Sequence, residues 1–472
     1  MFKILVKKIY SIYFTKPPLA EELVMKRLLV MGAVLAGALA LSSCGGSKDS
    51  GTSASGTKQV TIRYQLWDSA QLPAYQAAAK VFMEKNPNIK VDIAQLGWDD
   101  YWTGLQTEMV GGTAGDVFTD HLAKYLDFAS KNQLVDLTPY IERDNVDMSI
   151  YMNDLEKLWQ SKDGKTYGLP KDWDTICIVY NKHLTDSANV TAEELNSMNW
   201  NTKDGGSFET MIKKLSYDAN GNNGLSPAFD KKNVVQYGLV VSRSDDRGQA
   251  QFSPLAYSTG WTYTDGLYDS NYHYDDPRFI ETIEWMKKMQ DEGFIAPYTE
   301  VANGSASVFN AERAALVFDG SWMIGTYKAI GSFDVGFALL PEGPAGRKSM
   351  INGLGDSIWT GSKHKEEAWQ WVKFLASRES QEIIGSYGVV FPAIQSGVDK
   401  ALETYKNKGW DVSSFTIEAT TPNCTFLYPI LDNSVEIGQI MQRTFDQIFL
   451  GELDVKSALE ASNKNVKALF NK

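Results

Sequence analysis

From residue 59 onward, hydrophobic positions recur with two different periods along the chain. The segments 59–67 and 88–96 alternate apolar and polar residues, as half-buried strands do, whereas 72–87 and 99–112 repeat apolar residues every three to four positions, as amphipathic helices do. The segment 115–120 predicts a further short strand with an acidic end. This strand–helix–strand–helix–strand order predicts a parallel sheet with helical crossovers, and therefore an α/β lobe.

The alternation of strands and helices resumes later in the chain. The chain is long enough for two or three domains with substantial cores. The patterns predict a strand over 175–180, a helix after the loop that opens 200–216, a helix and then a strand within 299–323, two strands and an amphipathic helix within 332–377, and amphipathic helices over 434–451 and 455–470.

The predicted parallel strands end in stretches that place an aromatic residue beside a carboxylate. These stretches are "LWDSA" at 66–70, "LGWDD" at 96–100 and "VFTDH" at 117–121. In open α/β sheets, ligands gather beyond the carboxyl ends of the strands. We therefore expect a ligand site at this edge of the sheet.

An apolar stretch with a different layout precedes this globular part. From Met25 the chain ("MKRLLVMGAVLAGALALSSC") shows two cations, an apolar run and then small residues, which is the layout of a secretory signal over 25–43. The run is short for a membrane-spanning helix with flanks of this kind. We interpret residues 1–24 as a non-native upstream extension and leave them out of the fold argument.

The end of the apolar run, "LSSC", is similar to a bacterial lipobox. In such a sequence Cys44 receives a diacylglyceryl group and becomes the first residue of the mature chain. Residues 44–59 are rich in Gly, Ser and Thr, so we interpret them as a flexible tether that lets a lipid-anchored domain work outside the cell membrane. An ordinary signal peptide with an incidental cysteine, or a single anchoring helix, is the alternative.

The charge of the chain excludes several classes of partner. The whole sequence has a net charge of −12, and removing residues 1–43 leaves 40 basic and 56 acidic residues, a net charge of −16. Such an acidic protein is not expected to bind nucleic acid or to dock electrostatically on anionic lipid. The two remaining cysteines, Cys177 and Cys424, lie in apolar surroundings, which favours buried free thiols over a disulfide.

The order of four motifs along the chain is similar to that of a known family. "GWDDYWTGLQTEMVGGTAGDVF", "YGLPKDWDTICIVYNK", "FNAERAALVFDGSW" and "GLGDSIWTGSKHKEEAWQWVKFLASRES", followed by "GVVFPA", resemble the extracellular solute-binding proteins of family 1, the substrate receptors of ABC sugar importers. The resemblance implies an α/β fold of the two-lobe, periplasmic-binding-protein-like type (type II), with a hinged cleft between the lobes.

The resemblance also implies where the chain passes between the lobes. By analogy, the crossings are expected near 170–174, near 352–355 and shortly after Pro392. The first lobe is expected over 60–172 with a return at about 355–395, and the second over 173–354 with a return at about 396–472.

Aromatic and acidic side chains at the predicted strand ends point to a carbohydrate ligand. A pyranose ring packs its C–H face on an indole and offers a rim of hydroxyls to carboxylates and amides. The alternative for any single tryptophan is core packing, to which we assign Trp285 and Trp371, and for any single aspartate a helix cap or a turn. The resemblance adds that Trp322 stacks on sugar and that the loops matching "DVFTD" and "GLGD" line the cleft. The candidate ligand-binding residues are Trp67, Asp68, Trp98, Asp116, Asp120, Trp173, Asp174, Trp261, Asp319, Trp322, Gly355 and Asp356.

The stretch "DANGNNGLSPAFD" at 218–230 has the spacing of a calcium loop at its start. Its candidate oxygen ligands are Asp218, Asn220, Asn222 and Asp230. An asparagine stands where such a loop has glycine, and a phenylalanine where it has its bidentate glutamate. The alternative is a polar surface turn, and any calcium here would be structural.

We therefore predict a binding protein without a catalytic residue or a required cofactor. It would act as a monomer, capture a di- or oligosaccharide and deliver it to the permease subunits of an ABC transporter. Paired carboxylates between aromatic rings also describe glycoside hydrolases, so a surface-anchored hydrolase is one alternative. A receptor of the same fold for a non-sugar solute is the other.

Overall fold

The computed structural model describes residues 59–243 and 247–471. These residues belong to one compact unit, Lys58–Lys472. The expected upstream extension, the signal peptide, Cys44 and the tether up to residue 58 lie outside the described residues.

A six-stranded sheet gathers strands from three separate parts of the chain. Its strands are β1 (Val60–Leu66), β2 (Ile89–Gln95), β3 (Val117–His121), β4 (Leu169–Asp174), β11 (Asn352–Ile358) and β12 (Phe391–Pro392), in the order β12-β4-β11-β3-β1-β2. β1 pairs parallel to β2 and to β3, which confirms the predicted parallel arrangement of the first three strands. β11 pairs antiparallel to both β3 and β4, so the later strands run against the first three.

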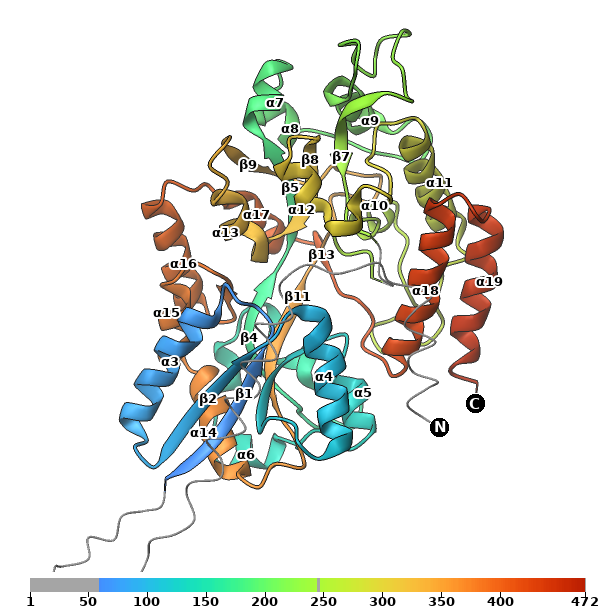
Figure 1. Ribbon diagram of the computed structural model, residues 1–472. Helices are drawn as coiled ribbons and strands as arrows, with labels where there is room; N and C mark the ends of the chain where they lie inside the picture. The colour runs from blue at the N-terminus through green and yellow to red at the C-terminus, as the bar shows by residue number, and fades with distance from the viewer. Residues whose placement is uncertain (1–58, 244–246, 472) are drawn as a thin grey trace, which may run out of the picture. The chain divides into compact units, whose positions relative to one another are not determined.

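Helices cover both faces of this sheet (Figure 1). α3 (Leu72–Lys85), α14 (Lys365–Leu375) and α15 (Arg378–Gly385) contact one another on one face, and α4 (Trp98–Gly111) and α5 (Tyr125–Ser130) lie on the other. α4 buries Trp102, Leu105 and Met109, the face that its apolar spacing predicts. It ends at Gly112, whose φ of 72° is left-handed and favours glycine. Three short helices follow α5 in the chain: α6 (Thr138–Arg143), η1 (Met148–Ile150) and η2 (Met152–Trp159). The longer helix α16 (Gln395–Asn407) follows β12.

The middle of the chain folds around a second sheet of five strands. They are β5 (Ile176–Asn181), β6 (Tyr217–Asp218), β7 (Val234–Val240), β8 (Ala314–Gly320) and β9 (Val335–Ala338), in the order β6-β7-β8-β5-β9. β7 and β8 are parallel, and the other pairs are antiparallel. The predicted strand over 175–180 is β5, and the predicted helix and strand within 299–323 are α12 (Ser305–Asn310) and β8.

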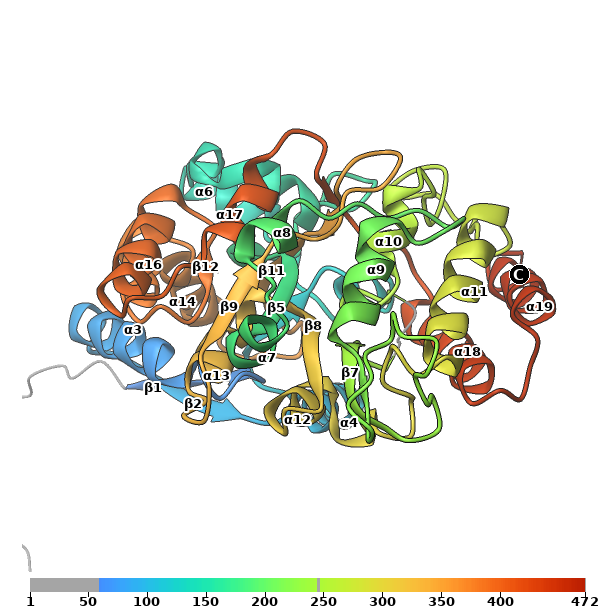
Figure 2. The ribbon, with the colours of Figure 1, turned by 90° about the horizontal axis from the view of Figure 1, so that it is seen from above.

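Helices from distant parts of the chain pack beside this second sheet. Figure 2 shows α11 (Pro277–Asp291), α18 (Ser434–Phe449) and α19 (Val455–Ala468) side by side, and the last two confirm the predicted C-terminal amphipathic helices. Trp285 of α11 is buried, as predicted, and its Nε1 donates to Glu209 Oε2 at 2.7 Å. The other elements are α7 (Lys182–Ser187), α8 (Ala192–Asn196), α9 (Gly206–Leu215), α10 (Ser253–Ser258), η3 (Val301–Asn303), η4 (Ser321–Met323), α13 (Ile324–Lys328), α17 (Ser413–Thr420) and the paired strands β10 (Ser349–Met350) and β13 (Thr425–Phe426).

The chain passes from the first sheet to the second within a single residue. β4 ends at Asp174 and β5 begins at Ile176, and the two form one nearly continuous ribbon in Figure 1. Thr175 between them is buried, and its Oγ1 donates to the Phe415 carbonyl oxygen at 3.0 Å. The predicted lobe boundaries stay a prediction. In the part expected to return to the second lobe, α16 packs against α15 and β12 of the first sheet.

Candidate binding site

A cavity of about 550 Å³ is lined by residues from both sheets. From the side of the six-stranded sheet come the segment after β1, the start of α4, the end of β3 and the adjoining ends of β4 and β11. From the side of the five-stranded sheet come Ser242, Arg243, the segment 247–251 and the segment from Trp322 to Thr326. A volume of this size is typical of small-molecule sites.

Indole rings form one wall of the cavity. Trp67 follows β1 and Trp98 opens α4, and their ring centroids lie 5.1 Å apart with an interplanar angle of 89°. Trp98 is 38% exposed, although its ring contacts those of Trp67, Trp102 and His121. The parallel strand order places both residues at the carboxyl edge of the sheet, where the sequence predicts them.

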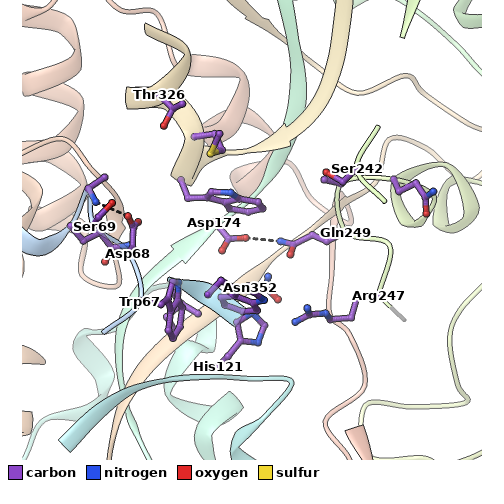
Figure 3. Close-up of a pocket in the computed structure, with 18 of the residues that line it drawn as sticks. Trp67, Asp68, Ser69, His121, Asp174, Ser242, Arg247, Gln249, Thr326 and Asn352 are labelled. Atoms are coloured by element: carbon purple, nitrogen blue, oxygen red, sulfur yellow. Dashed lines mark hydrogen bonds between the residues drawn. The ribbon is translucent and has the colours of Figure 1, made fainter. Parts of the chain in front are cut away.

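The opposite wall carries a third indole. Trp322 lies in η4, directly after β8, and it is partly buried. In Figure 3, Thr326 of the same segment lies across the cavity from Trp67 and His121. Aromatic rings therefore face the cavity from both sheets.

Two carboxylates lie between these walls, and each is held by hydrogen bonds. Asp68 Oδ1 accepts from the Ala70 N–H and Oδ2 accepts from Gln71 Nε2, both at 2.8 Å. Asp174 Oδ1 accepts from Gln249 Nε2 at 2.8 Å, so the end of β4 is bonded to the loop before α10 (Figure 3). Burial, and then the charge of Asp172, raise the pKa of Asp174 well above its ordinary value.

A buried ion pair supports the Asp68 side of the cavity. Lys171 Nζ donates to Asp172 Oδ2 at 2.7 Å and to Gln71 Oε1 at 3.0 Å, and all three side chains are buried. Gln71 in turn donates to Asp68. The orientation of Asp68 thus depends on a polar chain that reaches β4.

The structure brings together five of the candidate residues at the cavity: Trp67, Asp68, Trp98, Asp174 and Trp322. It places two of the other tryptophans in the core. Trp173 stacks on Phe391 at 4.8 Å, and Trp261 is fully buried, stacks on Phe279 at 4.4 Å and donates from Nε1 to the His273 carbonyl. Neither tryptophan is among the residues that line the cavity, because neighbouring aromatic side chains cover both indole rings.

The remaining candidate aspartates also lie away from the cavity surface. Asp116 precedes β3, at the amino edge of the sheet, where it accepts from the Arg63 N–H and from Ser362 Oγ. Asp120 and Asp356 are buried, and burial raises the pKa of each to about 7. Burial likewise raises the pKa of Asp319 to about 6, and its Oδ2 accepts from the Tyr327 hydroxyl at 2.6 Å.

Gly355, the last candidate, has a packing role in the structure. A Cβ at this position would lie 2.6 Å from the Trp159 ring and 2.9 Å from the Leu169 carbonyl oxygen. The glycine therefore allows β11 to pass close to Trp159 and β4.

The candidate calcium loop is closed by its own hydrogen bonds. Asp218 accepts from the N–H groups of Asn220, Asn222 and Asp230 and from Asn222 Nδ2, at 2.8 to 3.0 Å. These bonds lower the pKa of Asp218 to about 2. Within the described residues, no group of three or more His, Cys, Asp or Glu side chains is placed to hold a metal ion. The loop is thus closed through Asp218, and the calcium site over these four residues stays a prediction.

Several residues that line the cavity were not among the candidates. They include His121, Arg247, Gln249 and Asn352. His121 directly follows the candidate Asp120, and Asn352 lies three residues before the candidate Gly355, but a lone histidine or asparagine carries no pattern of its own. Gln249 and Arg247 belong to a loop that no periodicity connects to the sheet, so only the tertiary fold brings them to the cavity.

In the part of the chain that the structure describes, no helix combines the length and the apolar character needed to span a membrane.

Two α/β sheets joined by strands that pass directly between them, with a cavity lined from both, define a two-lobe binding protein of the periplasmic type II fold. The chain belongs to the bacterial extracellular solute-binding protein family, whose sequence pattern matches residues 67–382.

Known proteins similar to this chain include receptors for oligosaccharides. A maltooligosaccharide ABC transporter solute-binding lipoprotein of Streptococcus pneumoniae is 25% identical over 383 residues, which cover 76% of this chain and 78% of that protein. A galactooligosaccharide-binding protein of Bacillus subtilis is 22% identical over 453 residues, which cover 94% of this chain and 97% of that protein. An ABC substrate-binding protein of Listeria monocytogenes, solved with cycloalternan, superimposes with a TM-score of 0.75 at 21% identity, over 88% of this chain and all of that one.

Proposed function

We propose that this protein captures a di- or oligosaccharide in the cavity between its two sheets and delivers it to the permease subunits of an ABC transporter. The observation that carries the proposal is the placement of Trp67 and Trp98 on one wall and Trp322 on the other, with the carboxylates of Asp68 and Asp174 between them. Indole faces pack on the C–H faces of pyranose rings, and ionised or hydrogen-bonded carboxylates accept from hydroxyls. The relatives named for maltooligosaccharide and galactooligosaccharide support this ligand class.

The test is a binding screen with the protein from residue 45 onward. Maltotriose, mannotriose and galactotriose are added separately, and the melting temperature and the heat of binding are measured. A ligand that binds only the folded state raises the melting temperature with concentration. The proposal fails if these sugars and a wider carbohydrate panel leave the melting temperature unchanged.

The same samples separate capture from hydrolysis. We propose that the protein has no catalytic residue and needs no cofactor, so chromatography after incubation should return the sugar intact. Release of monosaccharide would support the glycoside hydrolase instead. Stabilisation by a polyamine or a metal chelate, with no response to sugars, would support a receptor for a non-sugar solute.

We also propose that the protein acts as a monomer that lipid on Cys44 anchors to the cell membrane, on its extracytoplasmic side. The resemblance of residues 41–44 to a lipobox and the lipoprotein named among the relatives support this location. Metabolic labelling with palmitate should mark the full chain and leave a Cys44→Ala variant unlabelled. Labelling of both chains, or of neither, would contradict the lipid anchor.

A further inference from the structure

The cavity-facing side of the six-stranded sheet carries an imidazole to which the proposed function assigns no role. His121 ends β3, and it lies opposite Leu354 of β11 in the antiparallel register. Asn352 lies two residues before Leu354, and its register partner is Asp174 of β4. Paired residues and residues two apart on a strand share one face of a sheet, so His121, Asn352 and Asp174 all face the cavity. Figure 3 shows the three side chains together there.

The turn after β3 fixes the tautomer of His121. The Ala123 N–H donates to His121 Nδ1 at 3.0 Å, and the Lys124 N–H donates to the His121 carbonyl oxygen at 2.8 Å. A ring nitrogen that accepts a hydrogen bond carries no proton, so the proton of the neutral ring lies on Nε2. The edge contact with the Trp98 ring, at 5.9 Å between centroids, holds the imidazole plane.

The ring is also kept neutral. His121 is 4% exposed, and burial, followed by the charges of Arg247 and Lys124, lowers its pKa well below the ordinary value. Within residues 59–243 and 247–471, Nε2 has no hydrogen-bond partner. Because His121 lines the cavity and its Nδ1 is occupied by the Ala123 N–H, the Nε2–H is the group that a ligand oxygen in the cavity can accept from.

We propose that His121 is a ligand-binding residue that donates its Nε2–H to a hydroxyl oxygen of the bound sugar. It supplies a donor of fixed position in a cavity where the side chain of Asp68 supplies acceptors. The inference rests on the proposed function, since it names a residue that would select the sugar by the position of one hydroxyl oxygen.

Two substitutions separate the two nitrogens of the ring. In His121→Asn the amide oxygen stands near the place of Nδ1, so it keeps the bond from Ala123 and lacks the donor at Nε2. In His121→Gln the longer side chain brings an amide N–H to the place of Nε2. With maltotriose as the probe in calorimetry, we expect His121→Asn to bind about tenfold more weakly, and His121→Gln to stay within about threefold of the wild type. The melting temperature of ligand-free His121→Asn should equal that of the wild type.

The inference is overturned if His121→Asn binds maltotriose as tightly as the wild type. If maltotriose does not bind the wild type, mannotriose and galactotriose take its place. If neither these three sugars nor any sugar of the wider carbohydrate panel binds, the proposed function fails, and this inference fails with it. If the wild type binds a sugar and His121→Asn binds it with equal affinity, only the inference about His121 fails and the proposed function stands.

Nuclear magnetic resonance gives a second, independent readout. Long-range proton–nitrogen correlation of the imidazoles, assigned with the His121→Gln variant, should show His121 as the Nε2–H tautomer at pH 7 without sugar. Addition of maltotriose should shift the Nε2 resonance. An Nδ1–H tautomer, or an Nε2 resonance unmoved at saturating sugar, would overturn the assignment.

Discussion

Single residues set the aromatic walls of the cavity through close contacts with their neighbours. Gly320, the last residue of β8, precedes Trp322 by two positions, and a Cβ there would overlap the Trp322 ring. The Trp322 indole can therefore lie over the backbone at the end of β8, in the five-stranded sheet. Trp67 is held differently, through edge contacts with Trp98 and Tyr101.

Replacement of Trp322 by alanine is expected to weaken sugar binding by about 1–2 kcal/mol, roughly a tenfold change, because it removes the indole from the wall opposite Trp67 and Trp98. Since Trp322 is only partly buried, stability should change little. Calorimetry with the best-binding sugar of the screen provides the measurement. Trp410→Ala is the matched control, because Trp410 stacks on Tyr405 away from the cavity. Equal affinity of Trp322→Ala and the wild type would contradict the role.

Secondary-structure elements follow closely from local patterns, whereas the site residues follow only in part. The periodic segments became β1, α3, β2, α4 and β3, and each end of α4 lies within one residue of the predicted range. Trp67 and Trp98 could be placed because parallel strands bring their carboxyl ends to one edge. Trp173 and Trp261 have similar local sequences, but their rings meet Phe391 and Phe279, which are 218 and 18 residues away. Such contacts depend on tertiary packing and leave no local pattern.

The ion pair between Lys171 and Asp172 makes β4 sensitive to loss of charge. We expect Lys171→Met to lower the free energy of unfolding by about 3–5 kcal/mol, because Asp172 would remain as an uncompensated buried carboxylate. The double variant Lys171→Met/Asp172→Asn should recover much of the loss. Urea denaturation measures both. The exposed pair of Lys165 and Asp163 is the control, and its removal should leave the free energy of unfolding almost unchanged, because water screens the pair.

The helix α18 is capped by a residue distant in sequence. Asn433 at its N-cap makes no side-chain cap bond, and the carboxylate of Asp127 in α5 accepts from the Ser434 hydroxyl at 2.7 Å and from the N–H groups of Ser434 and Val435 at 3.4 and 3.3 Å. Asp127→Ala is therefore expected to lower the free energy of unfolding by about 1–2 kcal/mol, whereas Asp127→Asn should retain most of it. Chemical denaturation with both variants checks this. An unchanged Asp127→Ala protein would show that water replaces the cap.

At the scale of the whole molecule, buried carboxyls link stability to pH. Burial raises the pKa of Asp120 and Asp356 to about 7 and that of Glu418 to about 8. Each folded-state value exceeds the unfolded one, so the folded protein binds more protons than the unfolded chain. Their contribution to stability is fully present below the unfolded pKa values, near 4, and is lost as the pH rises through the folded ones.

The free energy of unfolding is thus expected to fall between pH 6.5 and 8, by on the order of 1–3 kcal/mol. The lowered pKa of His121 opposes this trend only weakly in this interval and no longer towards pH 8, where its ring is neutral in the folded and the unfolded state alike. Urea denaturation at several pH values tests the prediction. Glu418→Gln keeps the oxygen that accepts from the Leu340 N–H and removes one titrating group, so its stability should fall less steeply. A rise in stability over this interval would contradict the assignment of these carboxyls.

The passage of the chain through Thr175 has a mechanical consequence. The last residue of β4, Asp174, lines the cavity, and the strand that leaves Thr175 on the other side pairs with β8, which leads to Trp322. A single buried residue thus separates the strand that ends at one wall of the cavity from the strand whose neighbour leads to the other wall. A change of a few degrees in its backbone torsions, matched in the other connections between the two sheets, would therefore alter the gap between the two aromatic walls.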